Sequence, residues 1–124
     1  MEQISTKNAS PPGGHYAQAV RHNGFVFVSG QLGFTPGTLE RTAGSIEQET
    51  RNCLENVAAI LEAAGSGLHK LVKVTIYVAS IDDWPRVNAV YEEYLGAHRP
   101  ARAIVPSGKL HHGFNVEVEA VASV

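Results

Sequence analysis

An arginine stands at the beginning of a short apolar segment near the carboxyl end of the chain. The three residues that follow Arg102 are all apolar. Because a guanidinium is rarely buried without a partner, Arg102 requires an anion close by. Glu117 and Glu119, on one face of a later alternating segment, are candidates within the chain, and residue type alone favours such an ion pair. A carboxylate ligand is the alternative, because a guanidinium can bind both carboxylate oxygens.

The other chemistry-bearing residues form no recognised catalytic or metal-binding motif. Ser29 lies in Val-Ser-Gly-Gln rather than in a Gly-x-Ser-x-Gly elbow, so its hydroxyl is expected to bond to nearby backbone. The six histidines have none of the spacings typical of metal ligands, and we expect no bound metal. Cys53 falls on the apolar stripe of an expected helix, which predicts a buried core thiol. No glycine-rich loop matches a nucleotide fingerprint, so no cofactor is expected.

Composition and charge exclude several classes of protein. A chain of 124 residues with 44% hydrophobic and 18% charged residues is expected to form a single domain, residues 1–124. The formal charge of −2, with scattered basic residues, argues against a nucleic-acid partner. No apolar run approaches the roughly 20 residues of a membrane helix, so no membrane partner is expected. The first residues lack signal-peptide features, which favours the cytoplasm, or an organelle if a presequence was removed.

Hydrophobic periodicity predicts seven elements. They are strands at residues 16–20 and 25–29, a helix at 45–64, a strand at 71–79, a helix at 82–96, and strands at 102–105 and 116–122. Asn23-Gly24 predicts a hairpin turn, and Ser45 with Gln48 predicts a capping box at the first helix. The side chains expected on the buried side of the second helix are Trp84, Val87, Tyr91, Tyr94 and Leu95, and those of the third strand are Val72, Val74, Ile76 and Val78.

The order of these elements, ββαβαββ, predicts an α+β domain. With right-handed crossovers, the strands form one mixed sheet and both helices pack on one of its faces. The opposite face is left without cover from the chain itself. In so small a domain, we expect that face to meet another subunit, so the architecture predicts a homo-oligomer.

Five blocks of sequence, in the same order along the chain, resemble the RidA (YjgF) family. The most specific is Pro100-Ala101-Arg102-Ala103-Ile104-Val105 followed by Gly108-Lys109-Leu110 and Val116-Glu117-Val118. The others are Tyr16-Ala17-Gln18-Ala19, Val28-Ser29-Gly30-Gln31, Leu54-Glu55-Asn56-Val57 and Val87-Asn88-Ala89-Val90-Tyr91. The blocks are distributed along nearly the whole chain, from residue 16 to residue 118.

The resemblance implies a chorismate-mutase-like α+β fold assembled as a homotrimer, with clefts between subunits. It also implies hydrolysis of 2-aminoacrylate-type enamines, or their imine tautomers, to 2-oxo acids and ammonia, without a cofactor. By position, Arg102 holds the substrate carboxylate and Glu117 positions or deprotonates the attacking water. Tyr16, Ser29 and Ile104 are the remaining substrate-binding residues that the resemblance implies.

The chain departs from the family pattern at positions near this implied site. Ile104 stands where many deaminases carry cysteine, so no thiol contributes, and His15 and His111 replace prolines. His112 and Phe114 also make the last loop bulkier than is usual in the family. Together these changes indicate a larger or aromatic substrate, such as an aminomuconate-type one, as an alternative. A non-catalytic module that binds small carboxylates is a second possible function. An endoribonuclease is a third, which the acidic net charge disfavours.

Overall fold

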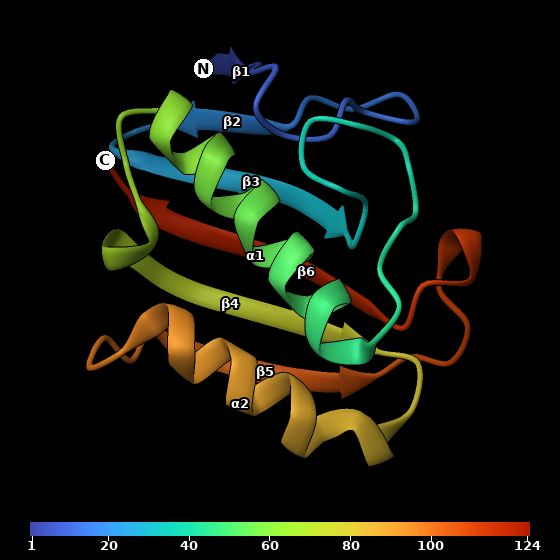
Figure 1. Cartoon of the computed structure of the whole chain (residues 1–124). Coiled ribbons are helices and arrows are strands. Elements are labelled where there is room, and N and C mark those ends of the chain that lie inside the picture. The colour runs from blue at the N-terminus through green and yellow to red at the C-terminus, as the bar shows by residue number, and fades with distance from the viewer.

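The computed structural model describes residues 1–124 as one mixed six-stranded sheet with two helices on one face (Figure 1). The strands are β1 (Glu2–Ile4), β2 (Ala19–His22), β3 (Phe25–Leu32), β4 (Leu71–Val78), β5 (Ala101–Pro106) and β6 (Val116–Ser123). The helices are α1 (Ile46–Ala63) and α2 (Trp84–Leu95), and the short 3₁₀ turns are η1 (Leu68–Lys70), η2 (Ile81–Asp83) and η3 (His111–Gly113). Neither α-helix is long and apolar enough to cross a membrane.

The strand order β1-β2-β3-β6-β4-β5 confirms the predicted mixed sheet. All neighbouring strands are antiparallel except β4 and β5, which are parallel and are joined through α2. A parallel pair needs such a long crossover, and the crossover brings α2 onto the same face as α1. Strand β5 comes last in the strand order, so it is an edge strand, and α2 lies next to it (Figure 1).

The amino-terminal part of the sheet differs from the prediction. Residues 1–15, for which no element was predicted, form an amino-terminal arm. Within this arm, residues 2–4 form β1 and pair with β2, and β2 begins at Ala19 rather than at residue 16. The reason is Gln18, a buried residue whose side-chain oxygen accepts a hydrogen bond from the Thr6 amide at 2.7 Å and whose amide group donates to the Ser10 carbonyl at 2.9 Å. These bonds tie residues 16–18 to the arm. The predicted turn is confirmed, with Asn23 and Gly24 at φ of 50° and 81°.

Helix α1 follows the predicted stripe, with one difference at its start. The Ser45 hydroxyl accepts a hydrogen bond from the Gln48 amide at 3.1 Å, as expected for the cap. The Gln48 side chain, however, donates to Asn52 at 3.0 Å instead of returning to Ser45, so the reciprocal half of the capping box is missing. Cys53 is fully buried in the core, as predicted.

Two side chains expected to be buried are exposed. Trp84 is 38% exposed because it begins α2, where one side of the first turn is open to solvent. Val72 is 45% exposed because the register between β4 and β6 shifts between Leu71 and Lys73, which turns Val72 away from the core. The buried side of α2 is formed instead by Val87, Val90, Tyr91 and Leu95.

The sheet has two faces of different character. Val74, Ile76 and Val78 of β4 and their neighbours on β6 are buried beneath the helices. The opposite face has no covering element in the chain, and Phe25 and Phe27 are 42% and 46% exposed on it. Since side chains alternate along a strand, the register decides on which face each candidate site residue lies.

Candidate functional site

Glu117 lies at the start of β6 and faces the uncovered side of the sheet. Its backbone pairs with Tyr77 of β4 and Leu32 of β3, while its neighbours Val116 and Val118 point into the core. Burial is the largest cause that raises the pKa of the Glu117 carboxyl, the negative charge of Glu119 adds to it, and His111 opposes it. A carboxylate with a raised pKa binds a proton closer to neutral pH, which suits general-base chemistry.

Gly30 leaves the space in which the Glu117 carboxylate sits. A Cβ atom built on Gly30 would lie 2.8 Å from Oε2 of Glu117, which is closer than real Cβ contacts, and 3.1 Å from Cδ. The carboxylate therefore lies directly against the backbone of β3. Gly30 belongs to one of the family-like sequence blocks but was not predicted to be a site residue, because only the register shows which side chain approaches it.

A cavity of about 540 Å³ opens beside Glu117 and is also lined by Tyr16 and Ser29. The Ser29 hydroxyl donates a hydrogen bond to the Ala17 carbonyl at 2.6 Å, which agrees with the backbone-bonding role expected from the sequence. Tyr16 is half-exposed, and its hydroxyl accepts a hydrogen bond from the Gly13 amide at 3.2 Å. None of the residues that line this cavity is Lys or Arg.

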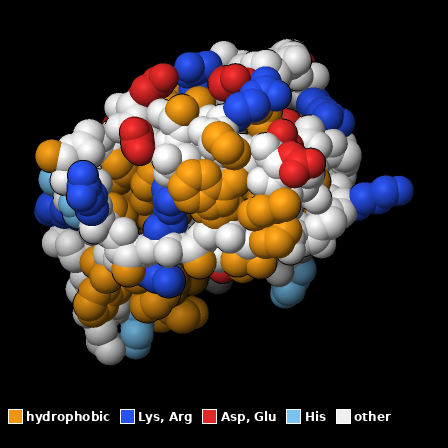
Figure 2. Space-filling model, turned by 90° about the horizontal axis from the view of Figure 1, so that it is seen from below, with side chains coloured by type: hydrophobic (Ala, Val, Ile, Leu, Met, Phe, Trp, Pro, Cys, Tyr) orange, Lys and Arg blue, Asp and Glu red, His pale blue; other side chains and the backbone are white.

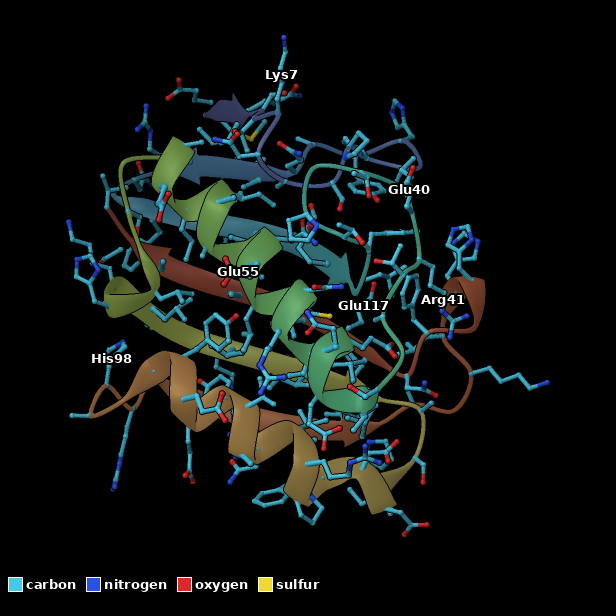
Figure 3. All side chains as sticks on the ribbon, in the orientation of Figure 1. Lys7, Glu40, Arg41, Glu55, His98 and Glu117 are labelled. Carbon is cyan, nitrogen blue, oxygen red and sulfur yellow. The ribbon has the colours of Figure 1, made fainter.

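The last loop forms part of the wall of the Glu117 cavity. The rings of His111 and His112 are stacked with centroids 3.8 Å apart, and both residues line the cavity. Arg41 fixes this loop by donating to the carbonyls of His112 at 2.8 Å and Gly113 at 3.0 Å. Figure 3 shows Arg41 and Glu117 at the same end of the molecule, where β6 begins.

Buried polar side chains of α1 hold the backbone around the cavity. Glu49 accepts hydrogen bonds from the amides of Asn115 at 2.5 Å and Val116 at 3.0 Å, which fixes the start of β6 next to Glu117. Asn56 accepts from the Ser10 amide at 2.8 Å and so fixes the arm. These roles were not predicted from the sequence. The available signal was polar residues at positions of α1 that face the core, including Glu49, Thr50, Asn52 and Asn56.

Arg102 lies on the helix-covered side of the sheet. Its backbone pairs with buried Val74 of β4, and its guanidinium donates a hydrogen bond from Nη1 to Oδ1 of Asn88 on α2 at 2.8 Å. The guanidinium carbon lies 4.7 Å from the centre of the Tyr91 ring and 5.7 Å from that of Trp84. Aromatic faces attract a cation at such distances without neutralising it.

Arg102 has no anionic partner in the chain. The ion pairs of the structure are Arg21–Glu2, Arg51–Glu93 and Arg86–Glu47, so the internal pair that residue type favoured is not formed. Glu119 instead accepts a hydrogen bond from the Tyr77 hydroxyl at 2.8 Å. Arg102 lines a second cavity of about 560 Å³, together with Glu92, His98 and Arg99.

Tyr91, one of the residues that line the second cavity, carries an unsatisfied polar group. The Tyr91 hydroxyl is buried and has no hydrogen-bond partner, and burial raises its pKa while Arg102 opposes the rise. Figure 2 views this side of the molecule from below and shows hydrophobic side chains gathered across it, with basic side chains among them and acidic ones along the upper rim.

The structure does not bring the two charged site residues together within one chain. Glu117 and Arg102 line different cavities and lie on opposite faces of the sheet. Ile104 pairs with buried Ile76, so it lies on the Arg102 side, where it packs against the core. Tyr16 and Ser29 share the Glu117 cavity.

No group of three or more His, Cys, Asp or Glu side chains is arranged to hold a metal ion. The thiol of Cys53 is enclosed in the core, where it contacts the Val116 carbonyl at 3.6 Å. Burial raises the pKa of this thiol well above its ordinary value, so the thiol stays protonated.

Comparisons with known proteins agree on one family. The family model described as Endoribonuclease L-PSP matches residues 6–124. A RutC family protein of Pyrococcus horikoshii is 43% identical over 121 residues, which cover 98% of this chain and 96% of that protein. A Homo sapiens protein named 2-iminobutanoate/2-iminopropanoate deaminase is 37% identical over 119 residues, which cover 96% of this chain and 87% of that protein.

Solved structures give the same assignment. The crystal structure of RidA from an Antarctic Psychrobacter species matches with a TM-score of 0.95 and 33% identity, covering 100% of each chain. The E. coli YjgF structure matches with a TM-score of 0.93 and 32% identity, covering 99% of this chain and 98% of that one. The chain therefore belongs to the RidA (YjgF) family, some of whose members are named imine deaminases.

Proposed function

We propose that this protein hydrolyses 2-enamine and 2-imine intermediates of the 2-aminoacrylate type to 2-oxo acids and ammonia. The supporting observation is that two incomplete sites complement each other. Arg102 is a guanidinium without an anion, and Glu117 lies in a cavity that no Lys or Arg lines. A substrate with a carboxylate next to an imine carbon needs both, one group to bind the acid and the other to activate water.

The complete site is a cleft between subunits of a homotrimer. Within one chain Arg102 and Glu117 face opposite sides of the sheet, so the neighbouring copy supplies one of them. The uncovered face and the unpaired edge of β5 are available for such an assembly, and Phe25 and Phe27 expose enough apolar surface on that face to favour burial against a second copy.

In the proposed reaction, Arg102 binds both carboxylate oxygens of the substrate and thereby orients its imine carbon. Water attacks this carbon while Glu117 accepts a proton from the water, and the C=N bond becomes a C–N single bond. Glu117 then returns the proton to the nitrogen, which gives the carbinolamine. It next carries the hydroxyl proton of the carbinolamine to the nitrogen, so that the C–N bond breaks, ammonia leaves and the carbonyl forms. One water is consumed, and the products are the 2-oxo acid and ammonia, so no cofactor is required.

The other implied residues have supporting roles. Tyr16 and Ser29 form part of the wall of the Glu117 cavity. The Ser29 hydroxyl donates its hydrogen bond to the Ala17 carbonyl, and its oxygen can still accept a hydrogen bond from the substrate. Ile104 supplies an apolar contact on the Arg102 side of the cleft. We place the activity in the cytoplasm, because the only cysteine is an unpaired core thiol, which suits a reducing compartment.

A larger substrate is a second candidate, favoured by the shape of the cavity. The stacked His111 and His112 rings in the wall of the Glu117 cavity offer aromatic surface that a short aliphatic side chain would not reach across. Rates on imines made in situ from amino acids of increasing side-chain size distinguish the two. A preference for the smallest imines would exclude the larger substrate.

The experiment that tests the proposal follows release of 2-oxo acid and ammonia from enamines generated in situ. Arg102→Ala and Glu117→Gln are both expected to lose at least about 100-fold in kcat/KM. Arg51→Ala, which removes a partly exposed arginine from α1, serves as the control and keeps the wild-type rate. A non-catalytic binding module predicts that wild type itself has no turnover and that Glu117→Gln still binds a 2-oxo acid. Equal rates for Arg102→Ala and wild type would exclude the mechanism.

A further inference from the structure

Arg102 is held by a neutral side chain whose orientation is itself fixed. Asn88 accepts the hydrogen bond from Arg102 through Oδ1 at 2.8 Å, and its Nδ2 donates to Oε1 of Glu92, one turn further along α2, at 3.1 Å. Because a carboxylate can only accept, Glu92 binds the amide nitrogen and leaves the amide oxygen towards Arg102. Without Glu92, the amide is free to turn its N–H groups towards the guanidinium.

The neutrality of Asn88 matters for anion recognition. A guanidinium carries five N–H donors, and Asn88 occupies only one of them without cancelling the positive charge. The Tyr91 ring, 4.7 Å from the guanidinium carbon, also supports the cation without supplying an anion. The partners of Arg102 thus fix its position and leave its charge and most of its donors for a ligand.

We propose that Asn88, oriented by Glu92, is a positioning residue that keeps Arg102 ready to bind the substrate carboxylate. This inference rests on the proposed function, because it assigns Arg102 to that carboxylate. Asn88 touches Arg102 rather than the reacting atoms, so its effect is on substrate binding. The three residues come from two elements, α2 and β5, whose relative position therefore matters for affinity.

Asn88→Asp is the decisive variant. Aspartate has the shape of asparagine and can still accept the hydrogen bond from Arg102, so a purely structural role predicts little change. A positioning role predicts a loss, because the new carboxylate pairs with Arg102 and competes with the substrate. We expect KM to rise about 10- to 100-fold while kcat changes less than about 3-fold. Asn88→Ala leaves the charge of Arg102 unpaired but removes the hydrogen bond that fixes the guanidinium. A smaller rise in KM, about 3- to 10-fold, is therefore expected.

Glu92→Ala and Glu93→Ala form a matched pair. Both remove one exposed negative charge from α2, but only Glu92 lines the Arg102 cavity and bonds to Asn88, whereas Glu93 pairs with Arg51. Loss of a negative charge from this cavity would by itself favour an anionic substrate, so a rise in KM for Glu92→Ala reports the lost orientation of Asn88. We expect Glu92→Ala to raise KM about 2- to 5-fold and Glu93→Ala to leave KM unchanged. Equal effects of the two would assign the loss to general electrostatics and would overturn the role of Glu92.

A binding measurement separates this inference from the proposed reaction. Titration calorimetry with pyruvate, a 2-oxo acid that the enzyme does not consume, reports the affinity of Arg102 for a carboxylate without turnover. Thermal melting identifies any variant that fails to fold, and Asn88→Ala replaces Asn88→Asp in that case. If wild type turns over imines and Asn88→Asp matches its KM and its pyruvate affinity, the positioning role is wrong. If wild type neither binds pyruvate nor turns over imines, the proposed function fails and the inference with it.

Discussion

Gly30→Ala tests whether Glu117 performs the reaction from the position that the structure gives it. The added Cβ would lie 2.8 Å from Oε2 of Glu117, whereas ordinary contact begins at 3.4 Å, so the carboxylate must move by about 0.6 Å. The backbone of Gly30 is not in the left-handed region, and the group that must move is the end of a flexible side chain. The folded state is therefore expected to change by less than about 1 kcal/mol. A displacement of 1 Å can cost about 100-fold in rate, and we expect kcat/KM to fall by about 10-fold or more.

Gly33→Ala is the matched control for this prediction. Its Cβ would meet the Glu49 side chain and, at 2.9 Å, the Glu49 backbone oxygen, which cannot move without shifting α1. This overpacking should cost about 1–3 kcal/mol and lower Tm by about 4 °C for each kcal/mol. The assay is 2-oxo acid release together with thermal melting of both variants. Wild-type kcat/KM for Gly30→Ala, or equal loss of Tm in the two variants, would refute the reasoning.

Three further measurements address single groups. Burial and the charge of Glu119 raise the pKa of Glu117, and a base is active only when ionised, so activity should fall on acidification at a pH above the range in which carboxylates ordinarily titrate. Glu119→Gln should move this acidic limb of the kcat/KM profile to lower pH, and an unmoved limb contradicts the assignment. Cys53 should resist a thiol reagent in the native protein and react fully in denaturant, since the thiol is buried and its pKa is raised. Rapid labelling of the native protein would contradict the placement of this thiol in the core. Glu49→Ala should lower the free energy of unfolding by about 2–4 kcal/mol in urea titrations, because the buried amides of Asn115 and Val116 lose their acceptor. A change below about 1 kcal/mol contradicts this role.

The helices and most strands were predictable because each has one side in the core. A stripe of apolar residues predicts α1, and alternation predicts β4 and β6, since both patterns record burial on a single side. Strand β1 could not be predicted in this way, because three residues are too few to show alternation and only Ile4 among them is buried. Its pairing depends on Gln18, a buried amide whose partners lie eight to twelve residues away.

The face of the sheet on which each candidate site residue lies could not be predicted from the sequence. The sequence resemblance assigned Arg102 and Glu117 to one site, but on which face each lies depends on the registers of β4 with β5 and with β6. A shift of one residue in either register would reverse the face, and no local pattern in the short β5 segment sets it. The hydrogen bond from Arg102 to Asn88 depends on the packing of α2 against β5, which sequence spacing does not reveal either.

Because Arg102 and Glu117 lie on opposite faces, the proposed cleft makes a prediction about mixed assemblies. Arg102→Ala and Glu117→Gln chains are each expected to be nearly inactive alone. When the two are co-expressed in equal amounts, about a quarter of the clefts in randomly mixed trimers would combine an intact Arg102 from one chain with an intact Glu117 from its neighbour. Activity should therefore return to about a quarter of wild type, whereas mixing either variant with the double variant should restore none. Co-expressed chains that stay as inactive as the separate variants, although mass spectrometry shows mixed assemblies, would mean that both residues act within one chain.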